Sequence, residues 1–318
     1  NNVIRFLHKL AETFFWVVLK KLDIESYDID VEVYEVYREW KLISYYFMDL
    51  FYRKEKRQWA WADIIRERNY EIMQKWIKNK IPLVVNCANF QKWINKTLLT
   101  IRDVETIFHE FWHALHAMLA ESKYSELNWF EVEWDFVELP SQLLENWVID
   151  KESLSKLAIH HETWVSIEEE LINKLEKLKI YMTWNFVVSQ NEYALLDLNL
   201  HMIENIPDSS LELDKICLDL IKKYSLFDKE ESYKMYCSFS HIFWWWYAAW
   251  YYSYMWAEII EAQVFDKIKK EWMFNKEVWK KYIDSILWPW TKKPAKELFY
   301  DFVKSDLDIN YFYKRKGL

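Results

Sequence analysis

The spacing of apolar residues predicts a small sheet early in the chain and a helical body after it. Residues 3–22 carry apolar side chains at near-helical spacing, and residues 29–33 alternate between apolar and acidic side chains, as a half-exposed strand does. Residues 42–51 are a candidate hairpin partner, and residues 82–90 have the pattern of a short buried strand. Helical patterns dominate everything after Asp103. We therefore expect a mainly α protein with a small β-sheet.

Three local patterns refine this picture. Glu39-Trp40-Lys41 separates two strand-like runs and has the position of a hairpin turn. Ser166 followed by Glu169 is the pattern of a capping box and predicts the start of a helix. The aromatic run 239–255 is nearly long enough to cross a membrane. It contains a histidine and several tyrosines, however, so we expect no membrane span.

The charge and cysteine content narrow the partners and the compartment. The 318 residues include 42 Lys and Arg against 50 Asp and Glu, a net charge of −8. Without a basic tract, nucleic acid is not expected as a partner. Cys87, Cys217 and Cys237 lie far apart in the sequence, which suits a reducing compartment, so we expect a cytoplasmic protein. The sequence starts at Asn1 rather than Met and shows no signal segment, which predicts a fragment or a processed piece.

The glycine and tryptophan counts are both abnormal. Glycine occurs once, at Gly317, and tryptophan occurs 21 times. Average usage would give about 22 glycines in a chain of this length. Several tryptophans also stand where the backbone favours glycine, as Trp40 does in the expected hairpin turn. We hypothesise that most of these tryptophans are glycines, encoded by UGA codons that the host reads as glycine. The alternative is a protein that is truly rich in tryptophan.

The strongest chemical signal is the pentad His-Glu-Phe-Trp-His at 109–113, inside an apolar helical run. Residues four apart share one helix face, so His109 and His113 can bind one metal ion together. Glu110 lies beside them and is placed to take a proton from a water that the metal activates. Two incidental histidines on a surface helix are the alternative. An apolar run weakens that alternative, because unpaired histidines are costly to bury.

A catalytic zinc site usually has three protein ligands and one open position, so a further ligand is expected nearby. The candidates are the acidic residues downstream of the pentad: Glu131, Glu133, Asp135, Glu138 and Glu145. Residues 133–142 can form a second helix, on which Asp135 and Glu138 share a face. Spacing alone does not choose between these two carboxylates.

Longer stretches of the sequence resemble one known family. Phe-His-Glu-Phe-Trp-His-Ala-Leu-His (108–116) is followed by Trp-Asp-Phe-Val-Glu-Leu-Pro-Ser-Gln (134–142) and by Glu-Asn-Trp (145–147). Further matching segments lie at 50–57, 86–90, 241–258 and 294–318. Together they resemble the thimet-type zinc oligopeptidases, in particular the oligopeptidase A and dipeptidyl carboxypeptidase group. The resemblance covers residues 1–318 as the C-terminal catalytic half, a zincin-type metallopeptidase domain, with the family's helical N-terminal half absent.

The resemblance implies roles for the residues around the pentad. It implies one zinc ion per chain, bound by His109, His113 and Glu138. Asp135 would then orient a ligand histidine from behind. Glu110 would be the general base.

A second segment, further along the chain, is implied to contact the substrate. The resemblance points to Tyr254 and Tyr251 as oxyanion and substrate contacts, with His241 and Tyr247 assisting. The three tyrosines are spaced i, i+4, i+7, which places them on one face of a helix-like segment. Aromatic core packing is the alternative explanation of this stripe.

The function implied by the resemblance is zinc-dependent hydrolysis of peptide bonds in short oligopeptides by a monomeric enzyme. The family has glycine at several positions where this chain has tryptophan: 112, 129, 245, 246, 250, and around 288 and 290. If those tryptophans are real, the indole at 112 is expected to crowd the segment carrying Glu138. The chain would then be an inactive, peptide-binding relative. A secreted, thermolysin-like zincin is a third reading, disfavoured by segment 135–142 and by the absence of a signal segment.

Overall fold

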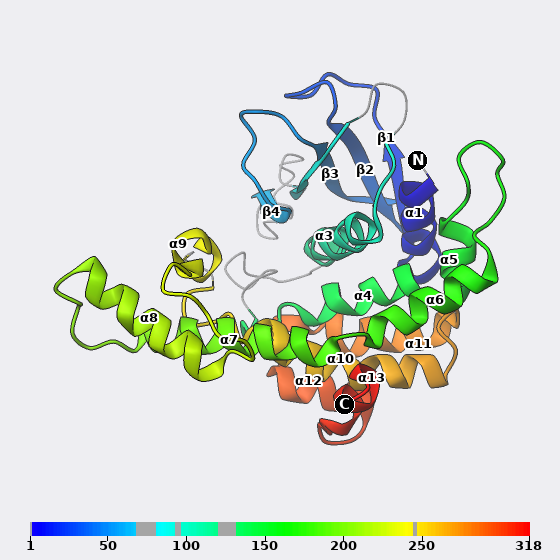
Figure 1. Ribbon diagram of the computed structural model, residues 1–318. Coiled ribbons are helices and arrows are strands. Elements are labelled where there is room, and N and C mark those ends of the chain that lie inside the picture. Colours follow the sequence, from blue (N-terminus) through cyan, green and yellow to red (C-terminus); the bar gives the residue numbers. More distant parts are fainter. Residues whose placement is uncertain (1, 68–80, 93–96, 120–131, 244–246) are drawn as a thin grey trace.

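The computed structural model describes residues 2–67, 81–92, 97–119, 132–243 and 247–318. In this part of the chain the protein is mainly α-helical with one small sheet, as the sequence predicts. Figure 1 shows the sheet on one side of helix α3 and a larger layer of helices on the other side. The two halves of the fold therefore meet at α3, the helix that carries the pentad.

Five strands form the sheet within the described residues, in the spatial order β1-β2-β3-β5-β4. Their bounds are β1 Val17–Lys21, β2 Glu32–Arg38, β3 Lys41–Phe51, β4 Trp61–Arg66 and β5 Leu83–Phe90. Neighbouring strands are antiparallel except β3 and β5, which are parallel. The strands predicted at 42–51 and 82–90 are confirmed as β3 and β5. β4 is an edge strand of the sheet.

The first predicted helix is shorter than expected. α1 (Asn2–Phe15) ends before residue 16, and the chain continues as β1 rather than as helix to residue 22. Trp16 has a φ of 56°, which breaks the helix, and the β-branched Val17 and Val18 after it favour extended backbone. The next strand is also displaced, because β2 begins at Glu32 rather than at residue 29.

The turn between β2 and β3 lies where the sequence predicts it. Arg38 pairs with Lys41, and the two loop residues Glu39 and Trp40 have φ values of 49° and 66°. Two consecutive positive φ angles are the type I′ pattern, whose twist matches that of the flanking strands. Glycine is the usual second residue of this turn. Trp40 takes that place here, and its side chain is 96% exposed.

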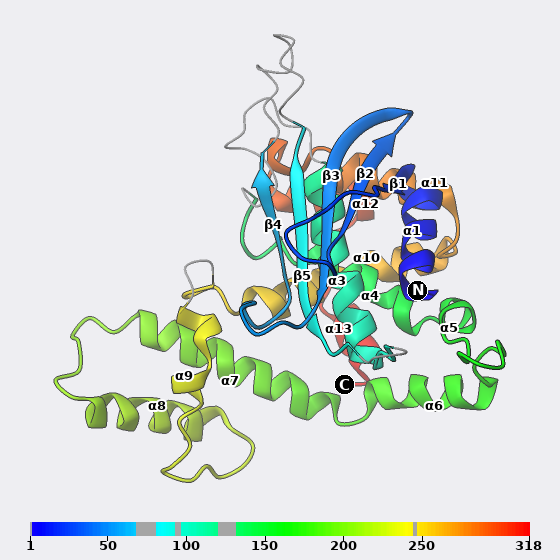
Figure 2. The same cartoon turned by 90° about the horizontal axis from the view of Figure 1, so that it is seen from above.

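The helical body follows the sheet in the sequence. Its main helices are α3 Ile101–Leu119, α4 Leu139–Ile149, α5 Lys151–Leu157, α6 Glu169–Ile180, α7 Thr183–His201, α8 Ser210–Tyr224, α9 Met235–Ser238, α10 Ser253–Lys270, α11 Lys276–Tyr282, α12 Ala295–Val303 and α13 Asn310–Lys316. α3 packs against β3, β4 and β5 on one side and against α4 on the other. α7 and α8 extend sideways as an arm in both views (Figures 1 and 2).

Two local predictions have different outcomes. No helix in the described ranges is long and apolar enough to cross a membrane. Part of the run 239–255 forms the short helix Ser240–Phe243, and α10 begins at Ser253. The capping box was wrong: α6 follows Glu168 without a side-chain cap, and Ser166 Oγ donates instead to the carbonyl of Ser155.

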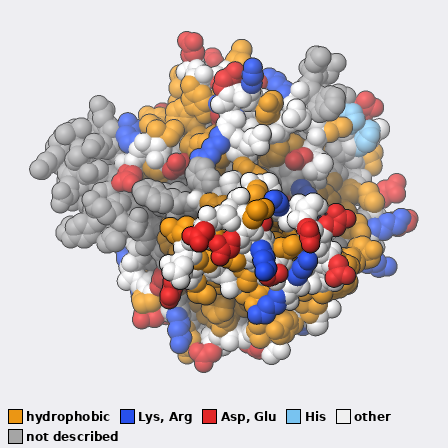
Figure 3. All heavy atoms as spheres, turned by 60° about the vertical axis from the view of Figure 1, so that its left-hand side comes forward, with side chains coloured by type: hydrophobic (Ala, Val, Ile, Leu, Met, Phe, Trp, Pro, Cys, Tyr) orange, Lys and Arg blue, Asp and Glu red, His pale blue; other side chains and the backbone are white. Residues whose placement is uncertain are grey.

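Two clusters of buried apolar residues hold the body together. The larger cluster runs through α1, the sheet, α3, α4 and the helices α10 to α12. The smaller cluster joins the arm to segment 236–242, through Leu196, Cys217, Ile221, Tyr236 and Ile242. On the face shown in Figure 3, acidic and basic side chains are interspersed among apolar ones.

A group of polar side chains ties α13 to the interior. Arg315 pairs with Glu261 of α10, and its Nη2 donates to Oδ1 of Asn146 in α4 at 2.8 Å. Asn146 Nδ2 in turn donates to Oε1 of Glu261 at 2.7 Å. Glu261 is fully buried, so its charge depends on these partners. Three helices that are far apart in the sequence are thereby joined at one point.

Tryptophan is over-represented among the residues with left-handed backbone. Nine described residues other than glycine have a positive φ, and five of them are tryptophans: Trp16, Trp40, Trp59, Trp164 and Trp272. Bulky residues rarely adopt this conformation, whereas glycine does so without steric cost. At about 1–2 kcal/mol each, the five tryptophans cost about 5–10 kcal/mol, which approaches the whole net stability of an ordinary domain. This strain supports the hypothesis that glycine occupies these positions in the native host.

We predict that the protein isolated from its native host carries glycine at positions 16, 40, 59, 164 and 272. Mass spectrometry of the peptides that span them would show each one lighter by the difference between a tryptophan and a glycine residue. The peptide containing Trp147, a position where the resembling family also has tryptophan, is the control and keeps its mass. Tryptophan at all five positions would contradict the hypothesis.

Candidate metal centre and peptide-binding site

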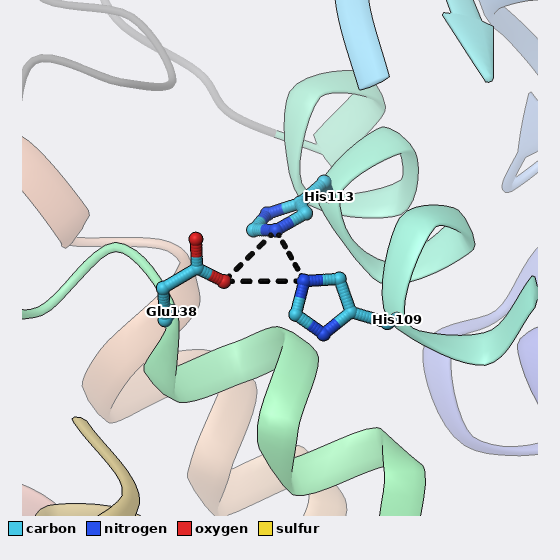
Figure 4. Close-up of side chains that lie close together, drawn as sticks. All are labelled: His109, His113 and Glu138. Atoms are coloured by element: carbon cyan, nitrogen blue, oxygen red, sulfur yellow. Dashed lines mark hydrogen bonds and ion pairs between the residues drawn. The ribbon is translucent and has the colours of Figure 1, made fainter. Parts of the chain in front are cut away.

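His109, His113 and Glu138 converge on one point between α3 and the start of α4 (Figure 4). Nε2 of each histidine lies 3.2 Å from Oε2 of Glu138, and the two Nε2 atoms lie 3.2 Å apart. Both histidines project from one face of α3, as their spacing of four requires. Two imidazole nitrogens and one carboxylate oxygen form a donor set that suits a divalent metal ion.

The charges around these three residues favour a cation. Burial raises the pKa of Glu138, but His113 and His109 outweigh this effect and hold it well below its usual value. Burial lowers the pKa of His109, but Glu138 and Glu145 hold it well above its usual value. The ionised carboxylates that attract a proton to the imidazole would equally stabilise a metal ion at this point.

Glu138 is presented by a turn and not by the helix that the sequence predicted for 133–142. Residues 134–138 form turns, and α4 begins at Leu139, directly before Pro140. Ser141 Oγ, in the first turn of α4, lies 3.0 Å from Oε2 of Glu138 and 2.9 Å from its backbone carbonyl oxygen. The start of α4 therefore fixes the direction of the Glu138 carboxylate.

Glu145, and not Asp135, lies against His109. Oε1 of Glu145 is 2.7 Å from Nδ1 of His109, the ring nitrogen opposite the one that faces Glu138. A carboxylate in this position sets the orientation of the ring and strengthens its donor nitrogen. Asp135 instead accepts a hydrogen bond from Tyr252 Oη at 3.3 Å. The difference arises because Asp135 lies in the turn before α4, whereas Glu145 lies on α4.

The sequence contained a signal for this role. Glu145 follows Glu138 by seven residues, which is two helical turns, so both carboxylates can face α3. From the sequence alone, Glu145 is only a candidate metal ligand. Of the other acidic candidates, Glu133 accepts the backbone N–H of Ala295 at 3.0 Å, and Glu131 lies outside the described residues.

Glu110 stands on α3 next to the ligands and is held in place through the sheet. Its backbone carbonyl accepts a hydrogen bond from Nδ2 of Asn86 at 2.7 Å. Oδ1 of Asn86, on β5, accepts a hydrogen bond from Tyr46 Oη of β3 at 2.7 Å. Burial raises the pKa of the Glu110 carboxyl, although the neighbouring histidines oppose the shift. A carboxyl with a raised pKa is better matched to accepting a proton near neutral pH.

Four further side chains predicted from the resemblance form one aromatic cluster, which reaches Glu138 through Tyr247: His241, Tyr247, Tyr251 and Tyr254. Tyr247 Oη donates a hydrogen bond to Oε1 of Glu138, and Nε2 of His241 lies 3.0 Å from Tyr254 Oη. The stacked rings of Tyr247 and Tyr254 have centroids 5.0 Å apart. Burial raises the pKa of both phenols well above the usual value, so their hydroxyls keep their protons and can donate.

These tyrosines do not share one helix face. Residues 247–252 form turns, and only Tyr254 lies in α10. All four side chains are half-buried, and three of them line a cavity of about 300 Å³. Its other walls include Trp59, Gln142, Phe186, Gln190, Phe239 and Glu258. Side chains that border such a cavity can contact a ligand, whereas side chains that only pack in the core cannot.

Trp112 lies in the main hydrophobic cluster, next to aromatic rings of α1 and α11. Its indole is fully buried and packs against Phe15, with ring centroids 4.8 Å apart, and near Trp279 at 6.5 Å. His109, His113 and Glu138 converge with tryptophan at 112. The indole Nε1 has no hydrogen-bond partner among the described residues, at a cost of about 1–3 kcal/mol that glycine would avoid.

Comparison with known families decides the relationship. The sequence matches peptidase family M3 over residues 1–318. The chain belongs to peptidase family M3. The resemblance to thimet-type zinc oligopeptidases is thereby confirmed, and the convergent histidines and glutamate lie in the segments that carried it.

Named relatives agree with the group expected from the sequence. Oligopeptidase A of Escherichia coli (strain K12) is 31% identical over 326 residues, which cover 100% of this chain and 47% of that protein. Dipeptidyl carboxypeptidase of the same bacterium is 28% identical over 264 residues, covering 79% of this chain and 38% of that protein. The chain thus spans about half the length of the oligopeptidase A that it matches.

Two solved structures share the fold. PZ peptidase A, solved with an inhibitor, has a TM-score of 0.56 and 16% identity, covering 85% of this chain and 43% of that one. A carboxypeptidase of Pyrococcus furiosus has a TM-score of 0.51 and 16% identity, covering 86% of this chain and 53% of that one. The M3 chain therefore has a metallopeptidase fold of the expected zincin-like kind.

We predict that Glu145→Gln weakens the affinity for Zn²⁺ by about 10- to 100-fold. The reason is that a neutral carboxamide is a weaker acceptor for His109 Nδ1 than the carboxylate. Asp135→Asn is the matched control and should leave this affinity almost unchanged. Competition against a chelating dye measures both dissociation constants. Equal losses in the two variants would contradict the role given to Glu145.

Proposed function

We propose that residues 1–318 are the catalytic domain of a zinc-dependent peptidase that hydrolyses peptide bonds in short oligopeptides. The observation that carries this proposal is the convergence of His109, His113 and Glu138 next to Glu110 in a member of peptidase family M3. Relatives carry the names oligopeptidase A and dipeptidyl carboxypeptidase, which describe enzymes acting on peptides.

Zinc is the ion that we assign to the three ligands, one per chain. Two imidazoles and one carboxylate with an open fourth position are the ligand pattern of several zinc peptidases. When bound, zinc supplies a Lewis acid that polarises the scissile carbonyl and lowers the pKa of a water molecule. The contact between Glu145 and His109 supports this assignment, because zinc-binding histidines usually have such a partner.

Glu110 and the tyrosine segment carry out the remaining steps. Glu110 accepts a proton from the attacking water and then passes it to the nitrogen of the departing amine. Tyr254 Oη, next to His241, donates a hydrogen bond to the carbonyl oxygen as negative charge develops on it. Tyr251, Tyr247 and His241 contact the peptide substrate.

We also propose a setting for this domain. Matched relatives are about twice as long, which supports a further half in the natural protein. From the family resemblance we propose that this half is helical, lies on the N-terminal side and belongs to a monomer. Short peptides are the partners that the cavity of about 300 Å³ suits. The three cysteines are free, which supports a cytoplasmic location.

Glu110→Gln should lower kcat for a fluorogenic peptide by about 100- to 10,000-fold, because the amide cannot accept the proton of the attacking water. The same variant should keep its bound zinc, measured by atomic absorption, since Glu110 is not a ligand. Glu170→Gln, an exposed position on α6, is the control and should retain full activity. Retained turnover in Glu110→Gln would overturn the assignment.

Tyr254→Phe should lower kcat about 100-fold and change KM little, because the lost hydroxyl acts mainly on the developing charge. Steady-state kinetics separate the two constants. Tyr300→Phe, on the exposed side of α12, is the matched control. A rise in KM at constant kcat would show that Tyr254 contributes to binding only.

A further inference from the structure

A buried carboxylate on the arm binds the segment that carries the active-site tyrosines. Asp197, on α7, is fully buried. Its Oδ1 accepts the backbone N–H of Ala249 at 2.9 Å, and its Oδ2 accepts the backbone N–H of Tyr251 at 2.9 Å. One side chain thus holds two alternate amides of the same turn. Burying a carboxylate is costly unless it is paired in this way.

The bonds to Asp197 add to the hydrogen bonds that the turn makes within itself. The amides of Trp250, Ser253 and Tyr254 donate to carbonyl groups within segment 247–251. Ala249 has a φ of 65°, a conformation that costs an alanine about 1–2 kcal/mol. Charge-assisted hydrogen bonds to Asp197 offset this cost and fix the path of the chain.

The same face of α7 also holds the far end of Tyr251. Gln190, Tyr193 and Asp197 are spaced three and four residues apart, so they form one stripe along the helix. Oε1 of Gln190 accepts a hydrogen bond from Tyr251 Oη at 2.9 Å, and the Tyr193 and Tyr251 rings are 6.1 Å apart. Residues of α7 therefore contact Tyr251 at its amide, its ring and its hydroxyl.

The contacts continue from Tyr251 to Tyr254 and His241. The rings of Tyr251 and Tyr254 have centroids 5.4 Å apart, and Tyr254 Oη lies 3.0 Å from His241 Nε2. No atom of Asp197 is needed in the chemistry itself. We propose that Asp197 is a positioning residue, which acts through the turn 249–251 to aim Tyr251 and Tyr254 at the substrate.

This inference rests on the proposed peptidase function, and its test separates the two. In the full natural protein, Asp197→Asn replaces one acceptor by an NH₂ group that faces a backbone N–H. We expect kcat to fall about 10- to 100-fold, with KM and bound zinc nearly unchanged. Asp219→Asn, on the exposed side of α8, is the matched control and should behave as wild type.

A double variant shows whether Asp197 acts through Tyr254. If it does, Asp197→Asn should reduce kcat far less in a Tyr254→Phe background than in the wild type, because the hydroxyl that it positions is already gone. Independent, multiplicative losses would overturn the inference. If Asp197→Asn does not fold, Gln190→Met tests the same helix face without a buried charge, and unchanged kcat there would also overturn it.

Amide hydrogen exchange supplies a readout that needs no catalysis. Exchange in the peptide spanning 247–254 should be at least about tenfold faster in Asp197→Asn than in the wild type, because two amides lose an acceptor. Unchanged exchange in an active enzyme would reject the role of Asp197 alone. Faster exchange in Asp197→Asn, together with a wild-type protein that hydrolyses no peptide, would instead reject the proposed function and leave the contact standing.

Discussion

The structure depends on one crossing, that of α3 with the start of α4. There a buried carboxylate, Glu138, stands between two imidazoles, 3.2 Å from each. Such a carboxylate is stable in the interior only because those rings, together with Ser141 and Tyr247, satisfy its oxygens. Asn86 of the sheet bonds to α3 on one side, and the helical layer packs against α4 on the other side.

Local geometry explains what could be predicted from the sequence. His109 and His113 share a helix face by spacing alone, and the hairpin turn at Glu39 and Trp40 lies between two alternating runs. Glu138 required the family resemblance, because a contact across 25 residues depends on tertiary packing. The boundary after α1 was missed because a single left-handed residue, Trp16, ends a helix without disturbing the apolar period.

The supporting residues were harder to predict for a related reason. Whether Asp135 or Glu145 meets His109 depends on where α4 begins, and the helix starts at Leu139, later than the apolar pattern indicated. Asp197 sits in an apolar helical run whose sequence gives no sign that it faces a turn 52 residues away. Side-chain direction at such sites is decided by packing between elements, which a single sequence does not display.

The tie between Arg315 and Asn146 has a consequence for the order of events during synthesis. Asn146 directly follows Glu145, and Arg315 leaves the ribosome 169 residues later. Until then Glu261 has no cationic partner from α13, and burying it is unfavourable. The contact that joins α4, α10 and α13 therefore forms only after residue 315 has been made.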